Sequence, residues 1–257
     1  MSCGLLDEVT LTSISHQLPP IEDLEKIVLR LSPDFISIKF KPDSTIPIAA
    51  VYLQDIINTL AEARYALHEV LAHKIWYLEK VEPKNEAAVV FFSRFYTDDI
   101  ALRLYSAGEH LAEAIVDMFE ISQQELAPYK KKRVSRQAIV GNYLRKEKPT
   151  HAVTIAVLSL ADSNEWRDTI KYRDEWVHSQ PPVVKGLGIV YKRGQRWKLS
   201  DSGKSYELGL GGGDEPKYSV DDLLKFIQPA LSQFTETSNA VVQFYIGLLN
   251  NRGPKFE

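Results

Sequence analysis

The side chains best suited to acid–base chemistry gather in one short run near the middle of the chain's second half. Asp174 and His178 are four residues apart, so on a helix they share one face and the carboxylate can orient the imidazole. Arg173 precedes His178 by five residues, which is about 140° around an ideal helix. We therefore expect the guanidinium and the imidazole to converge only where the helix unwinds or where a second subunit completes the site. The alternative is a surface ion network that caps the helix.

Other catalytic arrangements are incomplete in this sequence. His68 and His73 are five residues apart, so they do not share a helix face as the HExxH zinc motif requires. The glycine-rich stretch 209–213 has no lysine followed by serine or threonine, which a phosphate-binding loop needs. The single cysteine, Cys3, excludes a disulfide framework and cysteine-cluster zinc sites. We therefore expect neither a metal nor a cofactor.

The arginine–histidine spacing resembles a known family signature. Arginine, then aspartate, then three residues and histidine at 173–178 is similar to the R-x4-6-H motif of the HEPN superfamily. The run Tyr-Arg-Asp-Glu-Trp-Val-His, followed by Pro181 and Pro182, most resembles the Cthe-type HEPN family of poorly characterised bacterial proteins. The motif covers six residues, and the likeness over Val51 to Asn250 concerns the helix pattern alone. A long basic helix and a glycine-rich insertion depart from a minimal HEPN core.

The resemblance implies a metal-independent endoribonuclease, in which the ribose 2′-hydroxyl attacks the adjacent phosphorus. His178 would be the general acid or base, and Arg173 would stabilise the charge on the phosphate. Asp174 would fix the orientation of His178. The family also implies a homodimer with two motifs facing one cleft, and an antitoxin or nucleotidyltransferase partner by association.

Two other functions fit the same sequence and leave its status as an enzyme open. A non-catalytic HEPN module that binds RNA or a nucleotide would carry a basic groove continuous with the 130–136 segment, with the motif to one side. A dimeric helical scaffold would bury His178 among partners that satisfy it. Catalysis instead requires that Arg173 and His178 line one solvent-accessible cleft.

One region of this acidic protein is strongly basic, which makes its position informative. We interpret it as a contact for the RNA phosphate backbone, although a solvated helix face accounts for it equally well. No DNA-specific motif accompanies it. The candidate RNA-binding residues are Lys130, Lys131, Lys132, Arg133 and Arg136, followed by Arg145, Lys146 and Lys148.

The spacing of apolar residues predicts long amphipathic helices joined by short breaks, which is typical of an antiparallel up-and-down bundle. The fourth of these helices is apolar in its first half, which we expect to be central in the core, with a kink at 162–164. A basic third helix is expected to start at the Ser122–Glu125 capping box, unless Pro128 within its first turns delays the true start. The predicted helices cover Val51 to just before Pro83, about Glu86 to Ile121 unless Thr97–Asp99 interrupts it, Ser122 to about Lys148, His151 to about His178, and a last helix opened by a capping box of Ser219 and Asp222.

Two segments do not follow this pattern. Residues 1–48 form an N-terminal extension with a predicted helix over Ile21–Leu31 and a strand over Phe35–Phe40. Residues 49–257 form the bundle, interrupted at 184–217 by a glycine-rich insertion with a predicted hairpin of strands Leu187–Lys192 and Arg196–Ser200. The predicted fold is therefore mainly α, a helical bundle with a small β-hairpin insertion before the last helix.

Composition limits the environment of the protein. The chain has 257 residues, 44 % of them hydrophobic and 25 % charged, with a net charge of −3, which is ordinary for a globular protein and excludes a polycation. The longest uncharged apolar run, Ala152–Ala161, is far below the ~20 residues that a membrane span needs. Without a visible targeting signal and with one cysteine, we expect a cytoplasmic protein with no membrane contact.

Overall fold

The structure is a computed structural model that describes residues 6–31, 40–132, 134–178, 182, 184–186, 198–199, 206–207 and 216–251. The predicted strand over Phe35–Phe40 lies outside these residues except for Phe40, which is not in a strand. Arg133 and the predicted strand Leu187–Lys192 also lie outside them.

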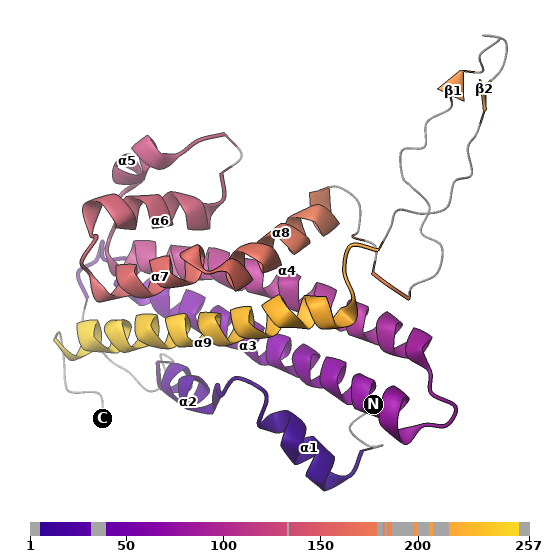
Figure 1. The fold of residues 1–257 in the computed structure, drawn as a ribbon. Helices are drawn as coiled ribbons and strands as arrows, with labels where there is room; N and C mark the ends of the chain where they lie inside the picture. Colours follow the sequence, from indigo (N-terminus) through magenta and orange to yellow (C-terminus); the bar gives the residue numbers. More distant parts are fainter. Residues whose placement is uncertain are drawn as a thin grey trace.

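The described chain is mainly helical and forms a bundle, as predicted (Figure 1). Helices α3 (Ile46–Ile75) and α4 (Glu86–Met118) form a long antiparallel pair, and α9 (Val220–Asn250) runs along it. Helix α8 (Asn164–His178) packs on α4 and α9. None of the helices in the described ranges combines the length and apolar character that crossing a membrane requires.

The predicted apolar stripes form the core of this bundle. Leu53, Ile56, Leu60 and Leu67 on α3 are each almost fully buried, because residues three and four apart lie on one helix face. The apolar stripes of α4 and α9 pack against the stripe of α3. The N-terminal helices α1 (Glu8–Ser15) and α2 (Glu22–Arg30) cover one flank, and α2 confirms the helix predicted at Ile21–Leu31.

Helix boundaries follow local signals. Both predicted capping boxes are present, with Ser122 and Glu125 at the start of α5 and Ser219 and Asp222 at the start of α9. The helical segment of α3 ends before Pro83, as predicted, and its last turn is a π-helical turn, η2 (Trp76–Lys80). Thr97, Asp98 and Asp99 do not interrupt α4.

The basic third helix is not continuous, which corrects the prediction of one helix from Ser122 to Lys148. After α5 (Gln123–Leu126) comes a short 3-10 turn, η3 (Ala127–Tyr129), which contains Pro128. Ser135 caps a new helix, α6 (Arg136–Glu147). The lysines at 130–132 therefore lie in a connection.

The helix predicted over His151–His178 is two helices, α7 (Ala152–Asp162) and α8, which meet at Ser163 as the predicted kink indicated. Contrary to expectation, the apolar α7 is not central in the core. Its buried side chains are Val153, Thr154 and Leu160, and Ile155 is 59 % exposed. Only one face of this short helix packs on the bundle. The apolar content of α7 therefore did not determine how deeply the helix is buried.

The predicted β-hairpin is not supported. Two short strands, β1 (Lys198–Leu199) and β2 (Tyr206–Glu207), pair antiparallel, whereas the prediction paired 187–192 with 196–200. The ends of the insertion do meet at the bundle, where the backbone N–H of Lys185 donates to the carbonyl of Tyr218 at 2.8 Å.

Candidate active site

Helix α8, which carries the arginine–histidine motif, is fixed to α4 by a buried polar contact. The hydroxyl of the fully buried Tyr172 donates a hydrogen bond to the carboxylate of Asp98 on α4. Arg94 Nε lies 3.5 Å from the other oxygen of Asp98. Burial raises the pKa of Asp98, against hydrogen bonds from Tyr172, Arg94 and Trp176 that lower it. Burial also raises the pKa of Tyr172, so its phenol stays protonated and remains a donor.

The guanidinium of the next residue, Arg173, stacks on a second side chain of α4, that of Tyr105. Its guanidinium carbon is 3.7 Å from the centre of the Tyr105 ring, a close cation–π contact. Tyr105 follows Asp98 by seven residues, about two helical turns, so both lie on the same face of α4. Burial raises the pKa of Tyr105, which keeps its ring neutral at physiological pH. One face of α4 thus anchors α8 and supports its arginine.

Arg173 and His178 meet within one chain. Arg173 Nη1 is 3.4 Å from His178 Nε2, although α8 is helical through His178. The expectation that helix unwinding or a second subunit is needed is therefore wrong. The angular argument applies to the Cα–Cβ directions, whereas the long, flexible arginine stem lets the guanidinium reach across the helix surface. With its proton on Nδ1, the imidazole accepts a hydrogen bond from Arg173 at Nε2.

Asp174 contacts the arginine instead of the histidine. Its Oδ1 accepts from Arg173 Nη1 at 2.9 Å, and within the described part of the chain it forms no ion pair with His178. The carboxylate therefore helps to hold the guanidinium in place. Arg173 Nε is buried and has no hydrogen-bond partner among the described residues, so this arginine retains a donor that is not used within the site.

A cleft of about 720 Å³ lies beside the motif, between α6, α7 and α8. Contrary to the expectation for catalysis, Arg173 does not line it, and its side chain is only 15 % exposed. His178 is exposed and lines this cleft together with Asp174 and Tyr105. The α6 wall includes Gly141, where an added Cβ would meet nothing within 4 Å. Apolar groups from Leu158, Ala161, Trp166 and Ile170 also line the cleft. It is thus large enough for a small ligand or a segment of a polymer.

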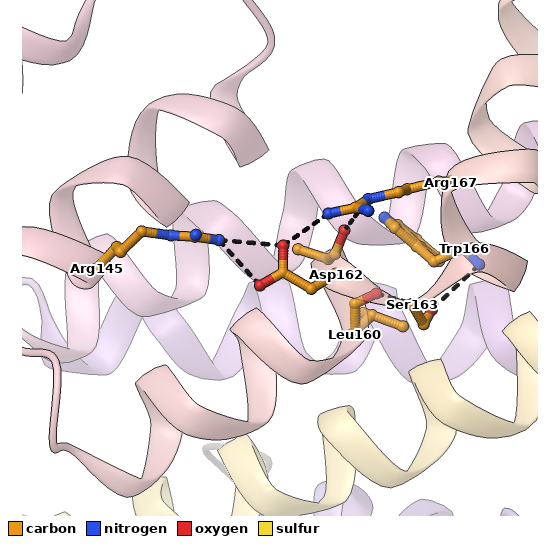
Figure 2. A network of polar contacts seen from close by, with 7 residues as sticks. Arg145, Leu160, Asp162, Ser163, Trp166 and Arg167 are labelled. Carbon is orange, nitrogen blue, oxygen red and sulfur yellow. Dashed lines mark hydrogen bonds and ion pairs between the residues drawn. The ribbon is translucent and has the colours of Figure 1, made fainter.

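Cations from two helices line the cleft away from His178. Arg145 of α6 and Arg167 of α8 both contact the carboxylate of Asp162, the last residue of α7 (Figure 2). Lys171 lies one helical turn after Arg167 along α8 and also lines the cleft. These three cations were not part of the predicted catalytic site.

Most of the predicted RNA-binding residues lie outside the cleft. Lys131 and Lys132 are exposed on the α5–α6 connection, and Lys130 Nζ donates to Gln123 Oε1 at 2.8 Å. Arg136 is engaged by an acidic pair on α4: its guanidinium lies 2.9 Å from Glu113, and its backbone N–H donates to Glu109 at 3.2 Å. Of the described residues in the predicted basic region, Arg145 lines the cleft, whereas Lys130, Lys131, Lys132 and Arg136 do not.

The described residues form no evident metal site. In the residues that the structure describes, no three histidine, cysteine or acidic side chains gather as metal ligands would. His68 and His73 each lie 3.6 Å from the buried Glu69. His73 stacks on Phe92 with ring centres 4.2 Å apart, and burial lowers its pKa. This packing favours a neutral, structural histidine.

Some cleft residues could have been found from the sequence. Arg167, Lys171 and His178 recur at intervals of four and seven residues, which places them along one face of the motif helix. Tyr105 carries no such signal, because its role depends on how α4 packs against α8. The pairing of Arg145 with Asp162 likewise joins separate helices.

Comparison with family models, with curated proteins and with solved structures gives no match.

Proposed function

We propose that this protein is a HEPN-type endoribonuclease whose reacting groups are Arg173 and His178. The observation that carries the proposal is the 3.4 Å separation between Arg173 Nη1 and Nε2 of His178, which lines an open cleft. A guanidinium beside an accessible imidazole can bind a phosphate oxygen while the imidazole handles a proton. The resemblance of the motif supplies the reaction class.

The proposed reaction needs two proton transfers at one phosphodiester. The ribose 2′-oxygen attacks the adjacent phosphorus, and the bond from phosphorus to the 5′-oxygen breaks. This leaves a 2′,3′-cyclic phosphate and a free 5′-hydroxyl. His178 takes the 2′-hydroxyl proton or gives a proton to the departing 5′-oxygen, and Arg173 stabilises the charge on the other phosphate oxygens.

The contacts around Arg173 suit this role. Tyr105 supports the guanidinium from one face and Asp174 holds Nη1, so the arginine loses little freedom when it binds a phosphate. A pre-positioned cation stabilises a developing charge without reorganisation. We assign Tyr105 and Asp174 as positioning residues for Arg173.

The alternative functions have less support from these contacts. A scaffold that buries His178 is disfavoured by the exposure of this residue. A binding module centred on the 130–136 segment is disfavoured because Arg136 is paired with Glu113 and the described basic residues of this segment do not line the cleft. Non-catalytic RNA binding in the cleft itself is the second candidate, and the chelator experiment below separates it from cleavage.

The homodimer implied by the resemblance remains part of the proposal. Because one chain already brings Arg173 and His178 together, a partner would add groups to the cleft without being needed for the pair. Sedimentation velocity over a concentration series measures this association, and a monomer at all concentrations would remove the dimer from the proposal.

The experiment incubates purified protein with mixed RNA in the presence of a metal chelator. We expect cleavage that survives chelation and that falls by at least about 100-fold in His178→Ala, the lower range for losing a general acid or base. The matched control is His16→Ala, which removes an exposed histidine at the end of α1, away from the cleft.

Two results would contradict the proposal. One is a His178→Ala protein that cuts as fast as the wild type. The other is RNA that binds the wild-type protein but stays intact, which would leave the non-catalytic binding module.

A further inference from the structure

The Arg145–Asp162–Arg167 cluster lies in the cleft wall, and its members come from three helices. Arg145 Nη2 is 3.1 Å from Asp162 Oδ2, and Arg167 Nη2 is 2.8 Å from Asp162 Oδ1. Figure 2 shows the two guanidinium groups approaching the carboxylate from opposite sides. Arg167 Nε also donates to the carbonyl of Ala161 at 3.2 Å, which fixes the direction of this side chain.

The cluster is too exposed to be an important support of the fold. The side chains of Arg145, Asp162 and Arg167 are 55 %, 48 % and 58 % exposed, and ion pairs at this exposure contribute little to stability. Opening the cluster therefore costs little. Two arginines that share one carboxylate also have the geometry with which arginine binds phosphate.

A third cation connects this cluster with the proposed active site. Lys171 lines the cleft between Arg167 and His178 on the same helix, and within the described residues it forms no ion pair. The rise from Arg167 to His178 is about 16 Å, as expected for eleven residues of α-helix. Phosphates in a nucleic acid strand are much closer together than this, at about 3.4 Å of axial rise per charge in a duplex strand. A nucleic acid strand that reaches both ends of the cleft therefore carries several phosphates.

We propose that Arg145 and Arg167 form a second phosphate site for a single-stranded RNA whose scissile phosphate lies at Arg173 and His178. Asp162 occupies that site in the free protein as an internal anion, which a backbone phosphate displaces. This inference rests on the proposed function because it uses His178 as the other end of the bound strand. Lys171 contacts the strand between the two sites, and the apolar wall at Leu158 and Ile170 packs against its sugars and bases.

The proposed role of Asp162 makes an unusual prediction about RNA affinity. Removing its charge should tighten binding, because the two guanidinium groups are then free to receive the phosphate. If the cluster only joins α6 to α7 and α8, the same change would weaken binding or leave it unchanged. Asp162→Asn keeps the shape of the side chain and removes the competing charge.

The test measures the affinity of the full chain for a labelled single-stranded RNA of about twelve nucleotides, in a His178→Ala background that prevents cutting. Fluorescence anisotropy over a salt series compares Asp162→Asn, Arg145→Gln and Arg167→Gln with their parent. The matched control is Asp23→Asn, which removes an exposed carboxylate from the Lys26 ion pair on α2, outside the cleft.

We expect Asp162→Asn to tighten binding by about threefold or more and Asp23→Asn to leave it within error, since only the former frees phosphate ligands. Each arginine substitution should weaken binding by about threefold to tenfold and reduce the slope of affinity against salt by about one unit. A dinucleoside monophosphate, which carries one phosphate, cannot occupy both sites and should be insensitive to Asp162→Asn.

Three outcomes would overturn the inference. They are Asp162→Asn binding no tighter than Asp23→Asn, the arginine variants binding as the parent does, and the dinucleotide responding as strongly as the long RNA. Failure of the proposed function is distinguishable. RNA that responds to Asp162→Asn but is not cut by the wild type keeps the second site and rejects the nuclease, whereas His178-dependent cutting with unaltered binding by the cluster variants does the reverse.

Discussion

Two cationic regions of this molecule differ in how their charges are used. The α5–α6 connection has the densest run of basic residues in the sequence, yet Lys131 and Lys132 extend into solvent and Arg136 is neutralised by Glu113. The cleft has fewer cations, and they come from separate elements: Arg145 from α6, with Arg167 and Lys171 from α8.

The difference shows that charge density along a chain is a poor guide to a binding site. Adjacent lysines on a connection repel one another and remain solvated, so they give a diffuse, salt-sensitive attraction. Cations that converge on a concave wall can bind one phosphate together. The predictions below test whether the cleft, and not the connection, carries the function.

The largest expected effect is on the active-site guanidinium. Arg173→Lys keeps the positive charge but loses the planar stack on Tyr105 and the contact with His178. We expect single-turnover cleavage to fall by at least about 100-fold, as on loss of a donor to a developing charge. Lys131→Arg, which also exchanges one cation for another, is the control. Equal rates for the Arg173→Lys variant and the wild type would show that only net charge matters.

Filling the cleft should be the next largest effect. Gly141→Leu places a side chain into the open cleft, and Gly247→Leu on α9 is its control because neither added Cβ meets an atom within 4 Å. Both changes remove a helical glycine and should leave thermal stability equal or slightly higher, by up to about 0.5–1 kcal/mol. Only Gly141→Leu should weaken RNA binding, by about tenfold or 1.4 kcal/mol.

If Gly247→Leu weakened RNA binding as much as Gly141→Leu, the proposal that RNA binds in the cleft would be contradicted. Loss of stability in the Gly141 variant, read from its melting temperature, would instead indicate that the cleft closes in solution.

A smaller effect is expected at Tyr105, whose ring supports Arg173. Tyr105→Leu removes a cation–π contact of about 1 kcal/mol, or about fivefold in rate, whereas Tyr105→Phe keeps the ring and should be nearly neutral. Because burial raises the pKa of Tyr105, the phenol stays protonated through neutral pH and does not act as the base. The pH–rate profile of Tyr105→Phe between about pH 6 and 8 should therefore match that of the wild type. A lost limb in that profile would give the hydroxyl a proton-transfer role.

The smallest effect belongs to the connection. Lys131→Gln combined with Lys132→Gln should weaken RNA binding by less than about threefold at physiological salt, because exposed charges act through a screened field. Titration against the same RNA as for the Arg167→Gln variant gives the direct contrast. A larger loss from the lysine pair than from Arg167→Gln would reverse the comparison between the two regions.

Apolar spacing was enough to predict the long helices. The α3 and α9 stripes and both capping boxes are where the sequence placed them, because these features depend on neighbours three and four residues away. The late start of α6 was indicated by Pro128, which lies within a segment that is otherwise helical in pattern. The shallow position of α7 was not predicted, because it depends on which face of the helix meets the bundle.

The sequence identified the residues of the candidate site better than it predicted their contacts. Arg173, Asp174 and His178 were identified from type and spacing, but Asp174 holds the arginine and not the imidazole. Tyr105 and Asp162 could not be predicted, since they join the site only through packing between helices. Local sequence gives the groups on one helix, and tertiary packing gives their partners.

The central claim is that Arg173 and His178 act together on one phosphodiester. The most direct test is a double-mutant cycle on single-turnover RNA cleavage under chelation, with Arg173→Lys, His178→Ala and the double variant. Groups that act as a unit are strongly non-additive, so we predict that the double variant cuts about as slowly as the slower single variant. Losses that multiply would show independent action and contradict the account.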